Sequence, residues 1–476
     1  MSGLRDNAPL LDAYLSYYES QRTPFTIPGH KQKAARLDLG LGLLVDSDIP
    51  LYGGLDEIKL TNQTLKKAES LAADFWGADY ARFSTGGSTH ANQAIVLALG
   101  SPGDKVAVAR TAHRSVLSAL VLAGLEPIWM SPVINKETGV PVGIGISEVN
   151  RALEENPIAI LLTEPGYLGS ISDLPTIIDT AHAHSVSVVI DAAWGGHFGF
   201  HPQFPLHALQ LGADALITSV HKALPGYSAS ALLLAQGKYL NLDRIEQSFE
   251  TTHTTSPAGA PLASIDAVRA LLQLRGHELC EELLEKVTKF KETVQSKFEI
   301  PIFLNVSDFP EGRFDPAKIV LRVQQLGADG IEIERELQAI GIRVEMADRD
   351  TIVFLATITD TSEDFEALSE ALIPILLRLR APRRESATAL SWSVVPQRGI
   401  SMRDAYFAKT EMVAADKAEG RICADLIAPY PPGVAVVAPG EILTAQILQG
   451  LKTSKNAGVR IAYATDPTLQ SYRVVR

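Results

Sequence analysis

The stretch VSVVIDAAWGG, residues 186–196, begins with a short apolar run and continues in small residues after Asp191. A run that is apolar throughout, rather than alternating, predicts a β-strand covered on both faces, which is typical of a parallel sheet. Ligands of α/β proteins gather beyond the carboxyl ends of such strands. A buried carboxylate there needs a charged or hydrogen-bonding partner, so Asp191 is a candidate site residue. The alternative is an ordinary turn aspartate.

Similar apolar runs lie on both sides of this strand, and helical stretches separate most of them. The runs are KVAVA (105–109), PIWM (127–130), IAILL (158–162), ALIT (215–218) and SALLLA (230–235). Two of the helical stretches are SVLSALVLAGL (115–125) and DLPTIIDTAHAH (173–184). This alternation of strand and helix predicts a doubly wound α/β domain.

The pattern changes after this region. A long amphipathic helix is predicted over residues 259–298, and a smaller α/β unit follows Pro301. The elements expected in this unit are a strand at 318–323, a helix at 330–341, a strand at 351–358 and a helix at 363–379. We therefore expect three parts, namely an N-terminal arm (1–60), a large domain (61–300) and a C-terminal region (301–476), which the basic linker at 380–386 could divide.

Composition limits the class of protein. The chain has 476 residues, with 43 basic and 55 acidic side chains and a formal net charge of −12, which disfavours nucleic acids and anionic membranes as partners. No apolar run approaches the roughly 18 residues of a membrane-spanning helix, and no secretory signal follows Met1. Cys280 and Cys423 lie outside any disulfide or metal-binding spacing and are expected to be buried thiols. A metal-free cytoplasmic enzyme of small molecules fits best.

The segment FSTGGSTHANQAIVLAL, residues 83–99, predicts a strand, a glycine-rich loop and a helix. Gly86 and Gly87 permit a tight turn, and the helix behind them offers unpaired N–H groups to an anion. Ser88 and Thr89 add hydroxyl groups, which makes a phosphate site. The same two residues could instead only cap the helix. The segment is neither a P-loop nor a G-x-G-x-x-G motif, so nucleotide binding is not favoured.

A third strand end lies in ADALITSVHKALPG (213–226), where Lys222 follows the strand. Taken alone, Lys222 could be a solvated loop residue. A phosphate site, a carboxylate such as Asp191 and a lysine are together what pyridoxal 5′-phosphate (PLP) requires, because the lysine forms a Schiff base and the carboxylate pairs with the pyridine nitrogen. His113 supplies a flat side chain that could stack on the pyridine ring, although a lone histidine is more often a helix-capping or surface residue.

Motifs along nearly the whole chain carry a resemblance to one family. They are PGHK (28–31), GGSTHAN (86–92), HRS (113–115), DAAWGGHFGF (191–200), SVHKALPG (219–226), TTSP (254–257), SIDAVRALLQLRG (264–276) and GRICADLIAPYPPGVAVVAPGE (420–441). On these residues the chain resembles the Orn/Lys/Arg decarboxylases, which are fold-type-I PLP enzymes, and among them the short biosynthetic type. The resemblance implies an aminotransferase-like large domain with a mainly parallel seven-stranded sheet, and a smaller C-terminal α/β part.

The resemblance also implies a role for each site residue. Lys222 would form the Schiff base, Asp191 would pair with the ring nitrogen and His113 would stack on the ring, which makes these three the expected catalytic residues. The other expected cofactor contacts are Ser88, Thr89, Ala193, Ser219, His221 and Ser256. Family members build their sites at a dimer interface, so we expect at least a homodimer, with the turn that carries Thr255 and Ser256 reaching toward the neighbouring subunit's cofactor.

The reaction implied by the resemblance is decarboxylation of a basic amino acid, giving CO2 and a polyamine precursor. Arginine and lysine are the first candidates for the substrate, and ornithine is the third. Another PLP reaction on the same scaffold, such as transamination or elimination, is an open alternative. A catalytically silent regulatory homologue is a second alternative, and retention of the three catalytic residues argues against it.

A long cationic substrate requires a carboxylate at its distal end, and the sequence offers several. The candidates are Asp56, Glu57, Glu164, Glu345 and Asp425, and Trp194 is a further expected substrate contact. The chain departs from the family pattern at Lys33, where glycine is usual, and at Gly166, where threonine is usual. Both departures lie in segments that border the entrance and the substrate in such folds.

Overall fold

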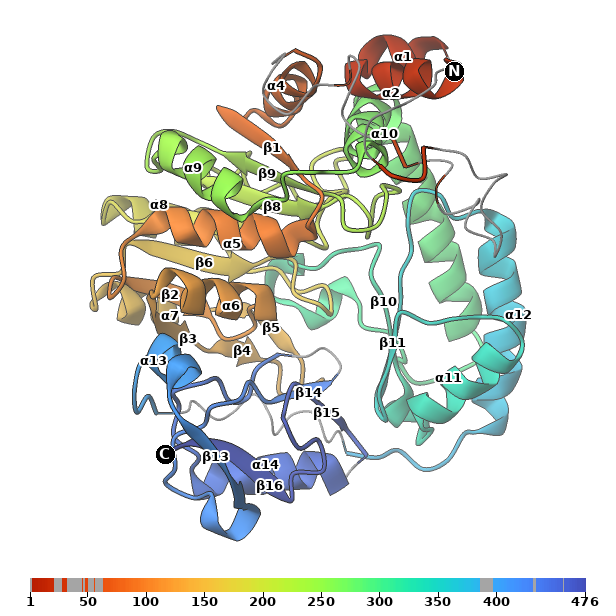
Figure 1. Ribbon diagram of the computed structural model, residues 1–476. Coiled ribbons are helices and arrows are strands. Elements are labelled where there is room, and N and C mark those ends of the chain that lie inside the picture. The colour runs from red at the N-terminus through yellow and green to blue at the C-terminus, as the bar shows by residue number, and fades with distance from the viewer. Residues whose placement is uncertain are drawn as a thin grey trace.

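The structure is a computed structural model that describes residues 2–20, 28–31, 45, 48–49, 55, 63–385, 397–430, 434–456 and 458–476. Its centre is a seven-stranded sheet with helices on both faces, and Figure 1 shows a smaller α/β unit to its right and a C-terminal unit below it. Lys33, Asp56 and Glu57 lie outside the described residues, so the expectations placed on them stay predictions.

The central sheet has the strand order β1-β9-β8-β7-β6-β2-β3. The strands from β8 to β3 run parallel, whereas β9 runs antiparallel to both of its neighbours. The bounds are β1 (Tyr80–Ser84), β2 (Lys105–Ala109), β3 (Glu126–Met130), β6 (Ala159–Thr163), β7 (Ser187–Asp191), β8 (Ala215–Ser219) and β9 (Ala231–Ala235). The prediction of a mainly parallel seven-stranded α/β sheet is therefore confirmed.

Successive residues of the central strands enter two different cores. Ile160 and Ile190 pack into the core that contains α8 and α10, while Leu161 and Val189 pack into the core that contains α5, α6 and α9. Side chains of a strand alternate between its two faces, so a strand with an apolar core on each side is apolar at every position. This double burial is the physical reason for the uninterrupted apolar runs in the sequence.

Helices cover both faces of this sheet. Figure 1 shows α5 and α6 lying side by side across one face, and they pack against each other through a shared apolar core. The helices of this region are α4 (Thr64–Trp76), α5 (Gly87–Leu99), α6 (Arg114–Ala123), α7 (Ile146–Leu153), α8 (Leu174–Ala183) and α9 (Leu242–Thr252). A two-stranded sheet of β4 (Pro132–Ile134) and β5 (Pro141–Ile144) extends the edge beside β3.

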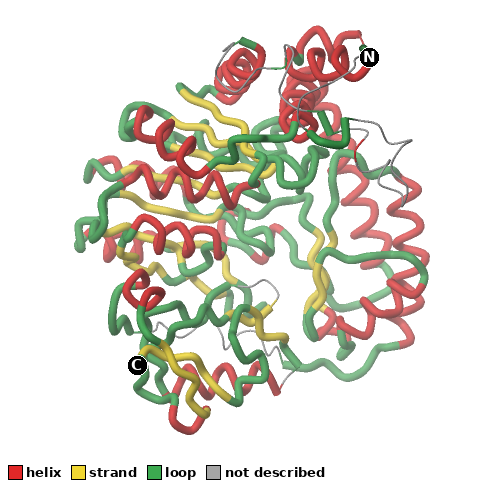
Figure 2. Tube along the Cα trace, viewed as in Figure 1, coloured by secondary structure: helices red, strands yellow, loops and turns green. Residues whose placement is uncertain are grey.

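The long helix α10 (Gly259–Gln295) leads from the large sheet to the smaller α/β unit, as the coloured tube of Figure 2 makes clear. Phe290 of this helix contacts Phe303, Phe354 and Phe365 of that unit. The elements of the unit are β10 (Ile319–Arg322), α11 (Gly330–Ala339), β11 (Met346–Ala347), β12 (Thr351–Phe354) and α12 (Ser362–Arg378). Each predicted strand and helix is present, within a few residues of its expected ends.

A C-terminal unit surrounds its own apolar core. Its elements are α13 (Met402–Phe407), β13 (Thr410–Ala414), β14 (Ala428–Tyr430), α14 (Ala445–Asn456), β15 (Arg460–Ala462) and β16 (Ser471–Val475). A buried ion pair joins it to the large sheet, because the Arg110 guanidinium donates to both Glu441 carboxylate oxygens at 2.7 and 2.8 Å. The domain boundaries proposed from the sequence at residues 60, 300 and 380–386 stay predictions.

The N-terminal helices α1 (Ser2–Asn7) and α2 (Pro9–Glu19) dock on α10, where the Leu10 N–H donates to the buried Asp266 carboxylate at 2.8 Å. Short 3-10 turns lie at Val306–Asp308, Pro310–Gly312, Val323–Leu326 and Ala415–Lys417. Cys280 and Cys423 are both free and buried, as predicted. In the described part of the chain, no helix is long and apolar enough to cross a membrane.

Candidate active site

Three strand ends meet at one edge of the central sheet. β1 ends at Ser84, β7 at Asp191 and β8 at Ser219. Because these strands run in the same direction, their carboxyl ends lie at the edge where ligands of α/β proteins bind. The hydroxyl groups of Ser88, just beyond β1, and Ser219 are 2.7 Å apart. The structure therefore brings the predicted strand ends together.

The N-terminus of α5 forms one end of this site. Gly87 has a φ of +69°, and a Cβ at Gly86 would lie 2.7 Å from the His90 Cβ, so both positions require glycine. No side chain caps the helix. Among the described residues, the backbone N–H groups of Ser88 and Thr89 have no hydrogen-bond acceptor. The capping alternative is therefore wrong, and the helix presents open N–H groups to an anion.

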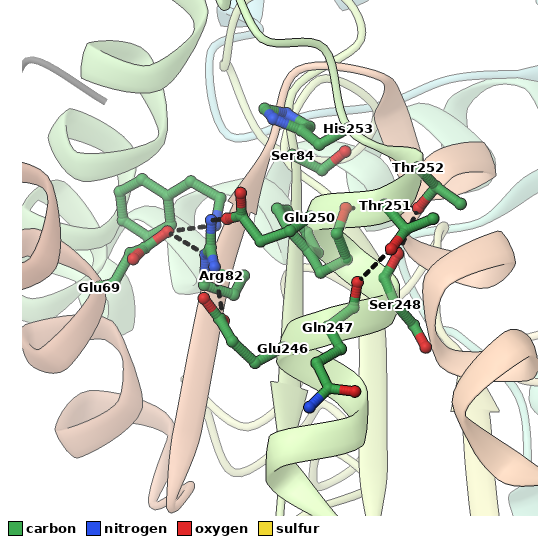
Figure 3. A network of polar contacts seen from close by, with 12 residues as sticks. Glu69, Arg82, Ser84, Glu246, Gln247, Ser248, Glu250, Thr251, Thr252 and His253 are labelled. Carbon is green, nitrogen blue, oxygen red and sulfur yellow. Dashed lines mark hydrogen bonds and ion pairs between the residues drawn. The ribbon is translucent and has the colours of Figure 1, made fainter. Parts of the chain in front are cut away.

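Arg82, on β1 just before this loop, ties the strand to two helices. Its guanidinium bonds to Glu69 of α4 at 3.1 Å and to Glu246 and Glu250 of α9 at 2.5 Å each (Figure 3). Burial raises the pKa of Glu69 to about 7, although the Arg82 charge and the Phe83 N–H oppose this. The network fixes where β1 ends, and hence where the helix N-terminus of α5 lies.

His90 connects the same loop to the end of α9. Its Nδ1 lies 2.8 Å from the Ser84 hydroxyl and its Nε2 lies 3.0 Å from the Thr252 hydroxyl. Burial, assisted by the nearby His253, lowers the pKa of His90 to about 4. The ring is therefore neutral at physiological pH, and each nitrogen can keep one hydroxyl partner.

A hydrogen-bond chain joins Asp191 to His113. The Asn92 amide donates to Asp191 Oδ2 at 2.8 Å and to the Ser115 hydroxyl at 3.0 Å, and that hydroxyl lies 2.8 Å from His113 Nδ1. The Ala193 N–H donates to the other Asp191 oxygen at 3.2 Å. Asn92 and Ser115 were not predicted as site residues, although both lie in motifs, GGSTHAN and HRS, that the sequence displays.

His113 is an exposed residue that caps α6, because its Nδ1 accepts a hydrogen bond from the Ser115 N–H at 3.2 Å. The helix-capping alternative is therefore confirmed, and stacking on a cofactor ring stays a prediction. Desolvation of the ring lowers the pKa of His113. The Asp191 carboxylate opposes that change, and the charges of Lys222 and Arg114 add to it. His113, Asp191 and Lys222 are therefore close enough to influence one another electrostatically.

Lys222 lies beyond β8 with its ammonium 4.4 Å from the centre of the Trp194 indole ring. Burial lowers the pKa of Lys222, and the charges of Asp191 and Glu345 oppose this. An amine with a lowered pKa is more often unprotonated and hence nucleophilic at neutral pH. Trp194, predicted as a substrate contact, is thus a direct neighbour of the predicted Schiff-base lysine.

A second group of residues lies around Trp194, with Lys318 from the smaller α/β unit and Tyr167 from the loop after β6. The Lys318 ammonium lies 4.1 Å from the Trp194 ring centre, and the Tyr167 ring packs edge-on against the same indole at 5.3 Å. The Tyr167 hydroxyl donates to the exposed Glu345 carboxylate at 3.3 Å. Glu345 is therefore brought to the site as predicted from the sequence. Lys318 was missed, because a lysine before a strand carries no distinguishing signal.

Glu164 and Asp425 do not join the residues around Trp194. Ser172 donates to Glu164 through its hydroxyl and its N–H, and burial raises the pKa of Glu164 to about 7. Glu164 lines a separate cavity of about 470 Å³ whose lining includes neither Lys222 nor Trp194. Asp425 accepts from the Thr465 N–H at 2.7 Å in the C-terminal unit.

The remaining predicted residues lie around this group. The His221 Nδ1 lies 2.9 Å from the Ser230 carbonyl oxygen, which orients the imidazole beside Lys222. Thr89 is exposed at the N-terminus of α5, and Thr255 and Ser256 are exposed in the turn between α9 and α10. At Gly166, a Cβ would lie 2.6 Å from the Ser170 hydroxyl, so the loop beside Tyr167 excludes the threonine that is usual there.

Comparison with known families identifies this arrangement. Residues 8–309 match the Orn/Lys/Arg decarboxylase major domain, and residues 391–460 match the Orn/Lys/Arg decarboxylase C-terminal domain. The chain belongs to the Orn/Lys/Arg decarboxylase family. The resemblance seen in the sequence motifs is thereby confirmed, and the chain is a member of a family of basic-amino-acid decarboxylases.

Relatives of this decarboxylase family member span its whole length. It is 32% identical to the arginine decarboxylase of Bacillus subtilis (strain 168), over 98% of this chain and 98% of that protein. Lysine decarboxylase A from Pseudomonas aeruginosa shares the fold with a TM-score of 0.84 at 19% identity, over 98% of this chain and 80% of that chain. A structure of SPT with PLP has a TM-score of 0.53 at 15% identity, over 66% of this chain and 77% of that one. The fold-type-I prediction is confirmed.

The residues of this family member suit PLP. An anion site with open N–H groups, a buried carboxylate held by Asn92, and a lysine amine of lowered pKa occupy one sheet edge. These are the three groups that the phosphate, the pyridine nitrogen and the aldehyde of PLP require.

Proposed function

We propose that this protein is a PLP-dependent decarboxylase of a basic amino acid, with arginine as the first substrate and lysine as the second. The observation that carries the proposal is the meeting of Lys222, Asp191 and His113 at the open N-terminus of α5. The identity of 32%, end to end, to a protein named arginine decarboxylase supports arginine.

Several residues would hold the cofactor. Its phosphate would bind the N–H groups at the start of α5 and the side chains of Ser88, Thr89, Ser219 and His221. His113 would stack on the ring from one side, and Ala193 would pack against the other. Ser256 would reach the cofactor of a second subunit, so the proposal includes a homodimer.

When bound, PLP supplies an electron sink for the carbon that loses CO2. Asp191 would hold a proton at the pyridine nitrogen, because two donors, the Asn92 amide and the Ala193 N–H, fix the orientation of its carboxylate. A charged hydrogen bond of this kind is strong in a site from which water is excluded.

Lys222 would act twice. Its amine, whose pKa burial lowers, is available to bond the cofactor before substrate arrives. Once CO2 has left, Lys222 or His113 would deliver a proton to the substrate Cα. The Trp194 ring beneath the Lys222 amine keeps water from one side of it.

Glu345 is the residue that we propose for the distal cation of the substrate. Its carboxylate acts on Lys222 electrostatically and accepts a hydrogen bond from Tyr167, yet it stays exposed and has acceptor capacity left. A guanidinium group could bond both of its oxygens at once, which an ammonium group cannot do.

The test is to incubate the purified protein, with added PLP, with arginine, lysine and ornithine separately, and to measure CO2 and the amine. We expect agmatine from arginine at the highest kcat/KM. Lys222→Ala should abolish both turnover and the visible absorption of the bound cofactor, while Lys289→Ala, at an exposed position of α10, should change neither.

Three outcomes would contradict the proposal. A keto acid formed with 2-oxoglutarate in place of CO2 would indicate a transaminase. A protein that binds PLP but releases CO2 from none of the three amino acids would have another substrate. A wild-type protein that stays colourless with added PLP would be a silent homologue.

A further inference from the structure

Lys318 is a buried lysine in the site that the proposed mechanism does not use. Only 6% of its surface is exposed. Its side chain begins at the foot of β10 and packs so closely on Gly169 that a Cβ at this glycine, whose φ is +97°, would lie 3.1 Å from the Lys318 Cβ. The ammonium ends against two aromatic rings, 4.1 Å from the centre of Trp194 and 5.3 Å from that of Tyr167.

This ammonium has no counter-ion in contact. Within the part of the chain that the structure describes, the Lys318 Nζ makes no hydrogen bond and has no carboxylate within ion-pair distance. Asp315 attracts it only at longer range, since that carboxylate already bonds His197 at 3.1 Å and the Ala317 N–H at 3.0 Å. A buried charge without a partner is costly, so an anion that reached this position would be bound favourably.

Lys318 and Lys222 lie against the same indole ring, and the Lys222 charge acts on Lys318. The Lys318 ammonium lies 4.1 Å and the Lys222 ammonium 4.4 Å from the centre of the same indole ring. The two nitrogen atoms therefore cannot be farther apart than the sum of these distances. An α-amino acid whose nitrogen takes the position of the Lys222 amine carries its carboxylate carbon two covalent bonds farther on. A carboxylate that extends from there over the Trp194 ring approaches the second ammonium.

We propose that Lys318 binds the α-carboxylate of the amino-acid substrate. This inference rests on the proposed function and divides the substrate among three residues: the nitrogen near Lys222, the carboxylate at Lys318 and the distal cation at Glu345. The amine product has no carboxylate, so it loses this contact when CO2 leaves. Lys318 therefore favours binding of the substrate over retention of the product.

A purely structural role is the competing explanation. Lys318 could hold the Trp194 and Tyr167 rings in place by cation–π attraction alone. In that case its removal would disturb every ligand of the site equally. A carboxylate anchor, in contrast, affects only ligands that carry a carboxylate.

The experiment compares matched ligands on the PLP-loaded dimer by calorimetry and Trp fluorescence. One pair is 5-guanidinopentanoate and agmatine, and the other is 6-aminohexanoate and cadaverine; in each pair the first ligand carries a carboxylate, and neither carboxylate ligand can undergo the reaction. In Lys318→Met, we expect the carboxylate ligands to bind about 10- to 100-fold more weakly, the range for a lost charged hydrogen bond. Binding of the amines should change by less than about twofold, and Lys318→Arg should restore the carboxylate ligands.

Lys291→Met is the matched control. Lys291 is partly buried and is also attracted by Asp315, but its ammonium already donates to the Pro316 carbonyl oxygen at 3.2 Å. This variant should keep the wild-type preference for carboxylate ligands. Equal weakening of carboxylate and amine ligands in Lys318→Met would overturn the proposal, and so would no weakening at all.

Pentanoate, which has a carboxylate but no distal cation, separates this inference from the proposed function. A protein that decarboxylates no basic amino acid, yet binds pentanoate only when Lys318 is present, would refute the proposed substrate and retain the anchor. A protein that decarboxylates arginine, and whose Lys318→Met variant binds pentanoate as well as the wild type does, would refute the anchor alone.

Discussion

Asn92 is the residue on which the orientation of two side chains proposed for catalysis depends. Its amide donates to Asp191 and to the hydroxyl group of Ser115 that contacts His113. In Asn92→Ala the buried carboxylate loses one of its two described donors, which typically costs about 1–3 kcal/mol. We expect PLP to dissociate about 10- to 100-fold more readily, as measured by equilibrium titration of the apoenzyme with PLP.

Gln93→Ala is the control for this prediction, because Gln93 is the next amide on α5 and reaches only the Ser118 hydroxyl at 3.5 Å. PLP affinity should stay within about twofold of the wild-type value. Equal losses in both variants would mean that helix α5, rather than the Asp191 contact, determines the affinity.

His90 makes the protein sensitive to acid. Burial lowers its pKa to about 4, whereas an unfolded histidine titrates near 6.5. Between these values the unfolded chain binds a proton that the folded chain does not, so stability is complete above about pH 6.5 and falls as the pH drops toward 4. The full loss is about 3 kcal/mol.

Urea unfolding of the wild type and of His90→Gln at pH 7.5, 6 and 5 measures this contribution. Gln keeps a polar side chain but cannot take up the proton, so the variant should lose less stability between pH 7.5 and 5 than the wild type does. Parallel pH profiles for the two proteins would show that His90 does not titrate on unfolding.

Individual residues differ in how far the sequence reveals them. Asp191 and Lys222 can be predicted because Asp191 ends a buried strand and Lys222 lies in the loop after another, and strand ends share one edge of an α/β sheet. Asn92 lies inside a helix, so only its motif draws attention to it. Lys318 reaches the site from another unit of the chain, and the tertiary packing that brings it to Trp194 leaves no local pattern.

At the scale of elements, Arg82 connects β1 with α4 and α9. In Arg82→Met three carboxylates lose their shared cation in a site where the guanidinium side chain is only 13% exposed. Removing one partner from a buried network typically costs about 3–5 kcal/mol. We expect a fall of this size in the free energy of unfolding, measured in urea, together with weaker PLP binding because the start of α5 shifts.

Arg151→Met provides the matched comparison. Arg151 also pairs with two glutamates, Glu148 and Glu155, but its side chain is 44% exposed. Exposed ion pairs contribute about 0–1 kcal/mol, so this variant should unfold nearly as the wild type does. A similar loss in both variants would contradict the role given to the Arg82 network.

The apolar pattern of the sequence does not reveal that β9 runs antiparallel to its neighbours. The run at 230–235 is apolar at every position because β9 packs between the same two cores as its parallel neighbours, and burial does not depend on strand direction. What reverses the strand is its connection. Residues 220–230 contain no helix, whereas a parallel return needs a crossover of a dozen or more residues.

At the scale of the whole molecule, the Arg110–Glu441 pair joins the large sheet to the C-terminal unit. Both side chains are almost fully buried, and Arg110 also stacks on Trp129. Glu441→Gln leaves the guanidinium charge without its partner, and we expect a loss of about 3–5 kcal/mol in the free energy of unfolding in urea. Arg398→Met, which removes the half-exposed Arg398–Glu126 pair at the same junction, should cost about 1 kcal/mol or less.

The Trp194 ring is contacted from two directions, by Lys222 of the large sheet and by Lys318 and Tyr167, and Lys318 belongs to the smaller α/β unit. Residues proposed for the chemistry and residues proposed for substrate choice are thus carried by separate stretches of chain. We expect mutations at 345, where we propose that the distal cation binds, to change which amino acid is accepted without displacing Asp191, Lys222 or the start of α5. Because of this division, we expect libraries that vary the smaller unit around Glu345 to yield new amino-acid substrates while the residues at the large sheet stay in place.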